Sequence, residues 1–250
     1  LSMEQCSSEK TALYKQSIAG DGASMIDLTS GLGIDFYFMS RHFKKAEYVE
    51  RNADLCRIAS HNFKSLGATN VSATNADGIE LIKASTSHYD LIFLDPARRD
   101  KNGKKTVEIK DCEPDVVDLK ETLLSKCDRM MLKLSPMLDI KSAIRDLGCV
   151  EEVHVVAVDN ECKELILVCK EKTELKRIVA ANIKSDGTTD KLESTSASPT
   201  GCSSYSAPLT YLYEPNVAIL KANISDCLAS EKVKKIAPFS HLFTSDELCE

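Results

Sequence analysis

The chain has 250 residues and a formal net charge of −6. A chain of this length buries about 70–75% of its unfolded surface, which is enough for one α/β domain of about 170 residues and a small second domain. Its apolar runs are shorter than the ~18 residues of a membrane span, and the N-terminus lacks the layout of a signal peptide. We therefore expect a cytoplasmic protein without a membrane partner.

The net charge and the positions of the cysteines disfavour further classes of protein. A net negative charge disfavours a protein that coats nucleic acid by charge alone, although a local basic patch remains compatible with it. The ten cysteines are scattered, with no C-x-x-C pair and no histidine at zinc-ligand spacing. Reduced, packed thiols are therefore expected, and no metal site is predicted.

The first candidate site follows a capped helix predicted at residues 7–18. An apolar run ends at Asp27, a turn with Gly31 and Gly33 follows, and an apolar helix is predicted over 34–43. A strand that delivers its carboxyl end to a cofactor has this layout. The two glycines allow the main chain and a ligand to approach closely, so we expect the floor of an S-adenosylmethionine site. Asp27 would receive the ammonium group of that cofactor.

Two other interpretations of this turn are open. The dinucleotide fingerprint requires a third small residue three positions after the second glycine, where this chain has Phe36. A pyrophosphate also disfavours an acid such as Asp27 beside it. The other alternative is a glycine-rich turn that binds no ligand.

A second acid ends the next predicted strand. Residues 46–50 form this strand, and Glu50 lies 23 residues after Asp27, which is the length of one βαβ unit. A carboxylate at this strand end can accept hydrogen bonds from both ribose hydroxyls. Residues 52–66 then have the helical period and end at a glycine.

A third acid, Asp77, follows a short strand predicted at 71–73. It is placed to accept the adenine amino group. It is equally placed to cap the helix that begins at residue 79, and the two roles are compatible.

The fourth predicted strand, 90–94, has four apolar residues in a row after Asp90 and runs directly into Asp95 and Pro96. Such a run suits a central parallel strand covered on both faces. Hydrogen bonds from an exocyclic amine to the Asp95 carboxylate and the Pro96 carbonyl would help to localise the nitrogen lone pair. We therefore predict that Asp95 and Pro96 orient the acceptor of a methyl group.

Several positively charged side chains follow Asp95 in the sequence. Amino-directed nucleic acid methyltransferases usually continue with a second proline and an aromatic residue, whereas this chain has Ala97 and Arg98. Arg98 could stack on a base or bind phosphate, and a solvated turn is the alternative. Five cations near the acceptor favour a polyanionic substrate; they are Arg98, Arg99, Lys101, Lys104 and Lys105.

Two further strand patterns complete the predicted sheet. A helix near 115–125 precedes a strand at 129–134, where Lys133 and Ser135 would line the same cleft as Asp95, or would simply form a strand-end turn. Residues 153–158 and 165–170 are joined too briefly for anything but an antiparallel pair. A doubly wound sheet that ends in such a hairpin is the class I methyltransferase layout.

The composition changes after residue 173. A strand is expected at 175–183, a long mobile loop rich in serine and threonine at 185–206, a helix within 211–230, and a strand at 233–236. We expect a methyltransferase domain at 1–173 and a small α+β module at 174–250.

Taken together, these segments resemble the bacterial class I S-adenosylmethionine-dependent methyltransferases with a C-terminal THUMP-like domain. The matching motifs are DLTSGLGIDFYF (27–38), YVERN (48–52), HNFKSLG (61–67), LDPARRD (94–100), KLSPMLDI (133–140), NECKEL (160–165) and YLYEPNVAILKA (211–222). The resemblance implies cofactor contacts at Asp27, Gly31, Gly33, Glu50 and Asp77; the expected set also includes Thr29, Arg51, Gly78 and Asp95. It also implies that this chain is a fragment of a longer pattern.

THUMP domains bind RNA, so the resemblance implies a methyltransferase that acts on rRNA or tRNA. The expected acceptor residues are Asp95, Pro96, Arg98 and Arg99, and the expected RNA contacts also include Lys104, Lys105, Lys133 and Ser135. Methylation of a small molecule or a protein is an alternative. A module that binds cofactor or RNA without catalysis is another.

Overall fold

The computed structural model of the chain describes residues 6–98, 108–195 and 205–249. Contacts divide the chain into two compact units, Leu1–Val150 with Leu167–Thr173, and Glu151–Ile166 with Glu174–Glu250. The domain boundary expected at residue 173 stays a prediction, because the second unit also includes part of the hairpin that precedes it.

The first unit is built on a parallel sheet with the strand order β7-β4-β1-β2-β3. Its strands are β1 (Gly22–Asp27), β2 (Phe43–Glu50), β3 (Val71–Asn75), β4 (Tyr89–Leu94) and β7 (Cys127–Leu134). The chain builds outward from β1 in one direction and then, from β4, in the other. Such a reversal opens a crevice at the carboxyl ends of β1 and β4. The apolar strand expected at 90–94 lies between two parallel neighbours, as predicted.

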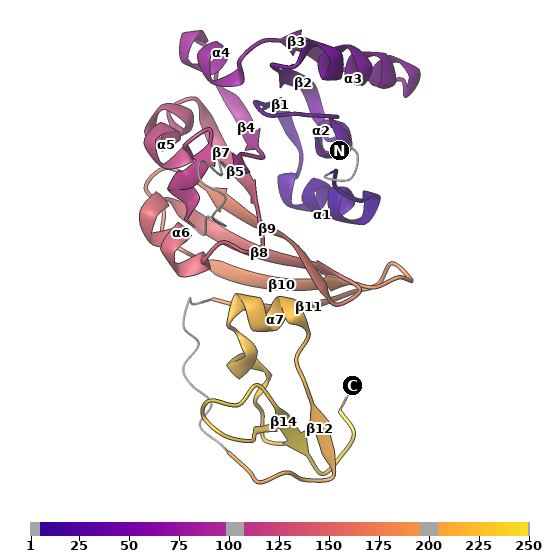
Figure 1. Cartoon of the computed structure of the whole chain (residues 1–250), viewed down its shortest axis with the longest axis vertical. Coiled ribbons are helices and arrows are strands. Elements are labelled where there is room, and N and C mark those ends of the chain that lie inside the picture. Colours follow the sequence, from indigo (N-terminus) through magenta and orange to yellow (C-terminus); the bar gives the residue numbers. More distant parts are fainter. Residues whose placement is uncertain (1–5, 99–107, 196–204, 250) are drawn as a thin grey trace. The chain divides into compact units, whose positions relative to one another are not determined.

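The described part of the first unit also contains six α-helices. They are α1 (Glu9–Ala19), α2 (Ile34–Ser40), α3 (Ala53–Ser65), α4 (Gly78–Ala84), α5 (Val116–Leu124) and α6 (Ile140–Leu147). Helices α1 and α2 pack together on one side of the sheet, and α5 and α6 pack together on the other (Figure 1). Within the parts of the chain that the structure describes, no helix combines the length and the apolar character needed to cross a membrane.

Aromatic side chains pack tightly beneath the glycine turn. The rings of Phe36, Tyr48 and Phe63 have centroids 5.3–5.7 Å apart, and Phe36 is fully buried. A Cβ atom at Gly33 would lie 2.6 Å from Phe63 Cζ, and Gly33 has a φ of +76°. The residue that conflicts with a dinucleotide fingerprint is therefore a core residue, and Gly33 is required by both space and backbone conformation.

The expected hairpin lies mostly in the second unit. Strand β8 (Val150–Val158) and strand β9 (Glu161–Cys169) are joined by Asp159 and Asn160, whose φ angles are 47° and 61°. Two consecutive positive φ angles define the tight turn that joins antiparallel strands. Strand β10 (Arg177–Ile183) pairs parallel to β8.

The expectation of a mobile loop at 185–206 is wrong for part of that range. Thr189–Ser194 form strand β11, which pairs antiparallel with β10. An Asp-Gly turn reverses the chain between them, with Gly187 at a φ of +87°. The hydrophilic composition concealed this hairpin, because serine, threonine and aspartate dominate both turns and loops. Residues 196–204 lie outside the described part.

The rest of the second unit forms a small antiparallel sheet with the order β12-β14-β13. Its elements are β12 (Tyr211–Tyr213), α7 (Val217–Ala222), the 3₁₀ helix η2 (Ser225–Leu228), β13 (Lys234–Lys235) and β14 (Phe243–Ser245). The helix expected within 211–230 is present as α7. The strand expected at 233–236 is present as β13.

Candidate active site at the carboxyl ends of the parallel strands

Two cavities in the first unit adjoin at the carboxyl ends of β1, β2 and β4. The first has a volume of about 230 Å³, and Asp27, Gly31, Gly33 and Lys133 line it. The second has a volume of about 240 Å³, and its walls include Glu50, Arg51, Asp77 and Gly78. Thr29 and Asp95 line both cavities. The four acids predicted at successive strand ends therefore lie around one pair of adjoining cavities.

Asp27 ends β1 and is 1% exposed. Its Oδ1 accepts a hydrogen bond from the Thr29 backbone N–H at 2.9 Å. Burial raises the pKa of the Asp27 carboxyl well above its ordinary value, and the negative charges of Asp35 and Asp95 add to this increase. A cationic group placed in the first cavity would reverse the effect, which is the electrostatic requirement for binding an ammonium.

Glu50 ties the glycine turn to the end of β2. Its Oε2 accepts from the Gly31 N–H at 2.8 Å, and its Oε1 accepts from the Asn52 N–H at 2.7 Å. The Tyr48 hydroxyl donates to the Gly31 carbonyl at 2.5 Å, which fixes the turn from the other side. Each carboxylate oxygen has two lone pairs, so Glu50 keeps acceptor capacity toward a ligand in the second cavity.

Asp77 caps α4, as one of the two expected roles requires. Its Oδ1 accepts from the N–H groups of Ile79 at 2.9 Å and Glu80 at 3.1 Å. Gly78 packs so closely on the end of β1 that a Cβ atom there would lie 2.2 Å from the Leu28 carbonyl oxygen. The cap and the glycine together hold the start of α4 against the second cavity. The role of Asp77 toward adenine stays a prediction.

The backbone of Asp95 is held in place by a hydrogen bond, whereas its side chain is partly exposed in the cavities. Its N–H donates to Thr29 Oγ1 at 2.6 Å, and its side chain is 41% exposed. Pro96 is buried, and the chain continues into the short strand β5 (Ala97–Arg98), which pairs with β6 (Cys112–Glu113). The acceptor motif is thus held between the sheet and a two-stranded ribbon.

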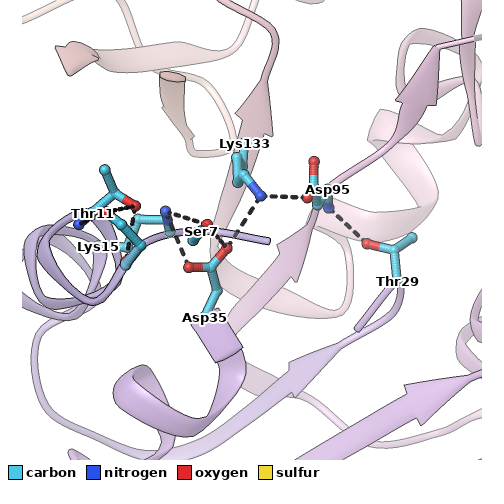
Figure 2. Close-up of polar contacts among 8 residues, drawn as sticks. Ser7, Thr11, Lys15, Thr29, Asp35, Asp95 and Lys133 are labelled. Carbon is cyan, nitrogen blue, oxygen red and sulfur yellow. Dashed lines mark hydrogen bonds and ion pairs between the residues drawn. The ribbon is translucent and has the colours of Figure 1, made fainter. Parts of the chain in front are cut away.

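Lys133, at the end of β7, lies where the sequence placed it. Its Nζ is 2.6 Å from Asp95 Oδ2 and 3.3 Å from Asp35 Oδ2 (Figure 2). Asp35 also contacts Lys15 of α1, with 3.1 Å between Nζ and Oδ1, and accepts from the Ser7 hydroxyl at 2.7 Å. The sequence analysis assigned no role to Lys15 or Asp35, because no local spacing connects a helix at residue 15 with a strand end at residue 133.

The remaining predicted residues occupy various positions. Arg51 lines the second cavity and pairs with Glu113 at 3.2 Å. Ser135 Oγ accepts from the Met137 N–H in the turn after β7, and neither cavity has Ser135 among the lining residues that the structure describes. Arg98 contributes backbone to β5. Arg99, Lys101, Lys104 and Lys105 lie outside the described residues.

A metal would need a cluster of suitable side chains. Among residues 6–98, 108–195 and 205–249, no group of three or more histidine, cysteine or acidic side chains is arranged to hold an ion. The acids of the two cavities instead contact backbone N–H groups, lysines, Arg51 and the Ser7 hydroxyl.

Comparison with protein families gives two matches, one to each end of the chain. Residues 10–113 match the family model described as conserved hypothetical protein 95, and residues 211–250 match a model described as a ferredoxin-like domain. The first match covers β1 to β4 and most of the cavity-lining residues. The second covers the small antiparallel sheet.

Two individual relatives match to different extents. The chain is 33% identical to a proposed methyltransferase from Porphyromonas gingivalis W83, whose crystal structure superimposes with a TM-score of 0.85 over 100% of this chain and 63% of that one. It is 32% identical over 76 residues to an uncharacterised RNA methyltransferase of Mycoplasma mobile, a match of 30% of this chain and 21% of that protein. This chain therefore spans only part of either relative. Its fold is the Rossmann-like α/β fold of methyltransferases, with a small antiparallel sheet at its C-terminal end.

Proposed function

We propose that this chain is a methyltransferase that uses S-adenosylmethionine and modifies a base nitrogen of RNA. The proposal is carried by one observation: Asp27, Glu50, Asp77 and Asp95 surround two cavities that adjoin at Thr29 and Asp95. The similarity to the Porphyromonas structure supports the reaction class, and the similarity to the Mycoplasma protein supports RNA as the substrate.

The residues present fit the cofactor. Gly31 and Gly33 have positive φ angles and place no side chain of their own in the first cavity, and Gly78 brings α4 against the end of β1. Asp27 would hold the ammonium group and Glu50 the ribose hydroxyls, with Asp77 at the adenine. Thr29, Arg51 and Gly78 complete the proposed cofactor set, because each lines the second cavity.

When bound, the cofactor supplies a methyl group that is already activated on a sulfonium. The chain therefore has to align the nucleophile, a contribution that reaches roughly 7–11 kcal/mol in favourable systems. Asp95 and the Pro96 carbonyl would accept the two N–H bonds of an exocyclic amine and localise the nitrogen lone pair. The backbone of Asp95 is fixed on Thr29, so its carboxylate is presented at a defined position.

We propose that the RNA is held in both units. Arg98, Arg99, Lys104, Lys105 and Ser135 would contact the substrate near Asp95, as the sequence suggests. Residues 174–250 would act as a THUMP-like module, and the side chain of Phe239, which is 98% exposed, offers a surface on which a base can stack. The proposed setting is the cytoplasm, where rRNA and tRNA are found.

A comparison of modified nucleosides tests the proposal. Total RNA from cells with and without the gene would be digested and analysed by mass spectrometry. We expect one methylated nucleoside to disappear in the absence of the gene and to return with the unaltered gene but not with an Asp95→Ala variant. An unchanged set of methylated nucleosides under varied growth conditions would contradict RNA as the substrate.

A further inference from the structure

Four side chains of alternating charge form a row that ends at the proposed acceptor residue. Lys15 contacts Asp35 at 3.1 Å, and Lys133 contacts both Asp35 at 3.3 Å and Asp95 at 2.6 Å (Figure 2). The ammonium of Lys133 is therefore shared between two carboxylates. One of them, Asp95, is the group that would receive the substrate.

Burial decreases along this row from the core to the cavity. Lys15 is fully buried, the side chains of Asp35 and Lys133 are 11% and 13% exposed, and that of Asp95 is 41% exposed. Burial favours the protonated form of Asp35, but the ammonium groups of Lys15 and Lys133 outweigh it and lower the pKa of this carboxyl. The inner end is therefore a buried anchor, and Asp95 at the outer end has the most exposed side chain of the row.

The shared ammonium and an amino substrate would use the same acceptor. Lys133 donates to Asp95 Oδ2, the carboxylate to which an exocyclic amine would donate. A charged donor binds a carboxylate more strongly than a neutral amine, so Lys133 competes with the substrate unless it has another partner. Asp35 is that partner, since its Oδ2 already lies 3.3 Å from Lys133 Nζ.

We propose that Asp35 is a positioning residue that retains Lys133 when the amino group of the substrate replaces this lysine on Asp95. The inference rests on the proposed function and specifies its substrate chemistry, namely a nitrogen that carries N–H donors. Lys133 keeps a carboxylate partner in both states, so the exchange leaves no buried charge without a partner. Lys15 and Ser7 hold Asp35 in place for this role.

Substitutions of Asp35 and Lys133, alone and together, test the exchange, because the second substitution should reverse the loss of activity that the first one causes. Asp35→Asn, Lys133→Met and the double variant would be compared for transfer of labelled methyl groups to RNA from cells that lack the gene. In Asp35→Asn, Lys133 loses the carboxylate that would retain it during the exchange and competes more strongly for Asp95, so kcat/KM should fall by about tenfold or more, mostly through KM for RNA. Removal of the competing lysine in the double variant should restore the value of Lys133→Met. A double variant as inactive as Asp35→Asn would overturn the proposal.

A second measurement needs no RNA. The pKa of the Asp95 carboxyl, followed by carbon-13 NMR in the whole chain, should fall more when Asp35→Asn is made in the unaltered chain than when it is made in Lys133→Met, because Lys133 is then no longer shared with Asp35. An equal fall in both backgrounds would overturn the proposal. If Asp35→Asn does not fold, the double variant Lys15→Met/Asp35→Asn removes both members of the buried ion pair. The activity and the titration are then measured in that double variant. Inactivity of the unaltered chain would refute RNA methylation, whereas the titration still decides the role of Asp35.

Discussion

Asp27 is the most deeply buried of the four acids at the candidate site, and its position opposes folding. Its carboxyl binds a proton more readily in the folded chain than in the unfolded chain, because burial and neighbouring negative charges raise its pKa. By linkage, this residue lowers the stability of the ligand-free protein as pH rises above the unfolded pKa of about 4. A residue kept at such a cost fits a binding role better than a structural one.

Asp27→Asn should therefore raise the melting temperature of the ligand-free protein at neutral pH. The gain should grow from pH ~4 up to the raised pKa of Asp27 and then stay constant, since below pH ~4 both side chains are neutral. Thermal unfolding from pH 4 to pH 8 measures this dependence. Asp54→Asn is the control, because Asp54 is exposed in a surface pair with Arg57. An equal pH profile in both variants would contradict the account of Asp27.

Glu50 provides the corresponding test of cofactor binding. S-adenosylhomocysteine should raise the melting temperature of the unaltered chain, since a ligand of the folded state stabilises it. Glu50→Gln should lose most of this shift, because hydrogen bonds to a charged group contribute about 1.5–3 kcal/mol, or tenfold or more in affinity. Differential scanning fluorimetry measures both shifts.

The control for Glu50 is Glu80→Gln on α4. The side chain of Glu80 is 74% exposed and pairs with Lys83 on the same helix. This variant should keep the full ligand-induced shift. If Glu50→Gln also kept it, Glu50 would have no role at the ribose.

At the scale of elements, the sequence predicted the five parallel strands and most of the helices of the first unit, and the acids at the strand ends, but not the short strands β5 and β6. It succeeded because apolar periodicity and terminal caps are local signals. It missed the row from Lys15 to Asp95, because its contacts join side chains that are 20, 98 and 38 positions apart in the sequence. It also missed β11, where a polar hairpin has the composition of a loop.

The start of α4 is the element most sensitive to a small change. Gly78→Ala would place a Cβ atom 2.2 Å from the Leu28 carbonyl oxygen, which is backbone and cannot rotate away. Helix α4 must then move from the end of β1, so both the melting temperature and the shift induced by S-adenosylhomocysteine should decrease. Scanning fluorimetry with and without ligand measures the two effects.

Gly148→Ala separates crowding from backbone strain. Gly148 also has a positive φ, +66°, but a Cβ atom there would have nothing within 4 Å. We expect a loss of about 1–2 kcal/mol from the left-handed conformation and an unchanged ligand-induced shift. Equal ligand shifts in both variants would show that the contact between Gly78 and β1 does not shape the second cavity.

At the scale of the whole molecule, we propose that the first unit binds the cofactor and the acceptor base, and that the second unit binds RNA. Both cavities that carry the proposed chemistry are lined by residues of the first unit. The second unit ends in a ferredoxin-like match and exposes aromatic surface, and several of its elements were expected, but the sequence did not predict how β12, β14 and β13 pair. Short strands of two or three residues carry too little periodicity to be predicted in order or pairing.

Phe239→Ala tests this division. The variant should bind RNA about tenfold less tightly, because stacking on an aromatic ring contributes roughly 1–3 kcal/mol per base. Its response to S-adenosylhomocysteine should stay unchanged. Filter binding with transfer RNA measures the first effect and scanning fluorimetry the second. Leu248→Ala, a change at a side chain that is 66% exposed in the same unit, is the control and should bind RNA normally. Equal RNA affinities would remove Phe239 from the interface.

The meeting of both cavities at Thr29 and Asp95 has a consequence for inhibition. Adenosine alone would occupy one compartment and homocysteine alone the other, and each fragment would bind weakly. A single molecule that joins them loses its rotational and translational freedom only once, so its affinity should exceed that expected from the separate fragments. Extending such a compound past Asp95 with an amine that displaces Lys133 would give a bisubstrate inhibitor selective for sites with this lysine.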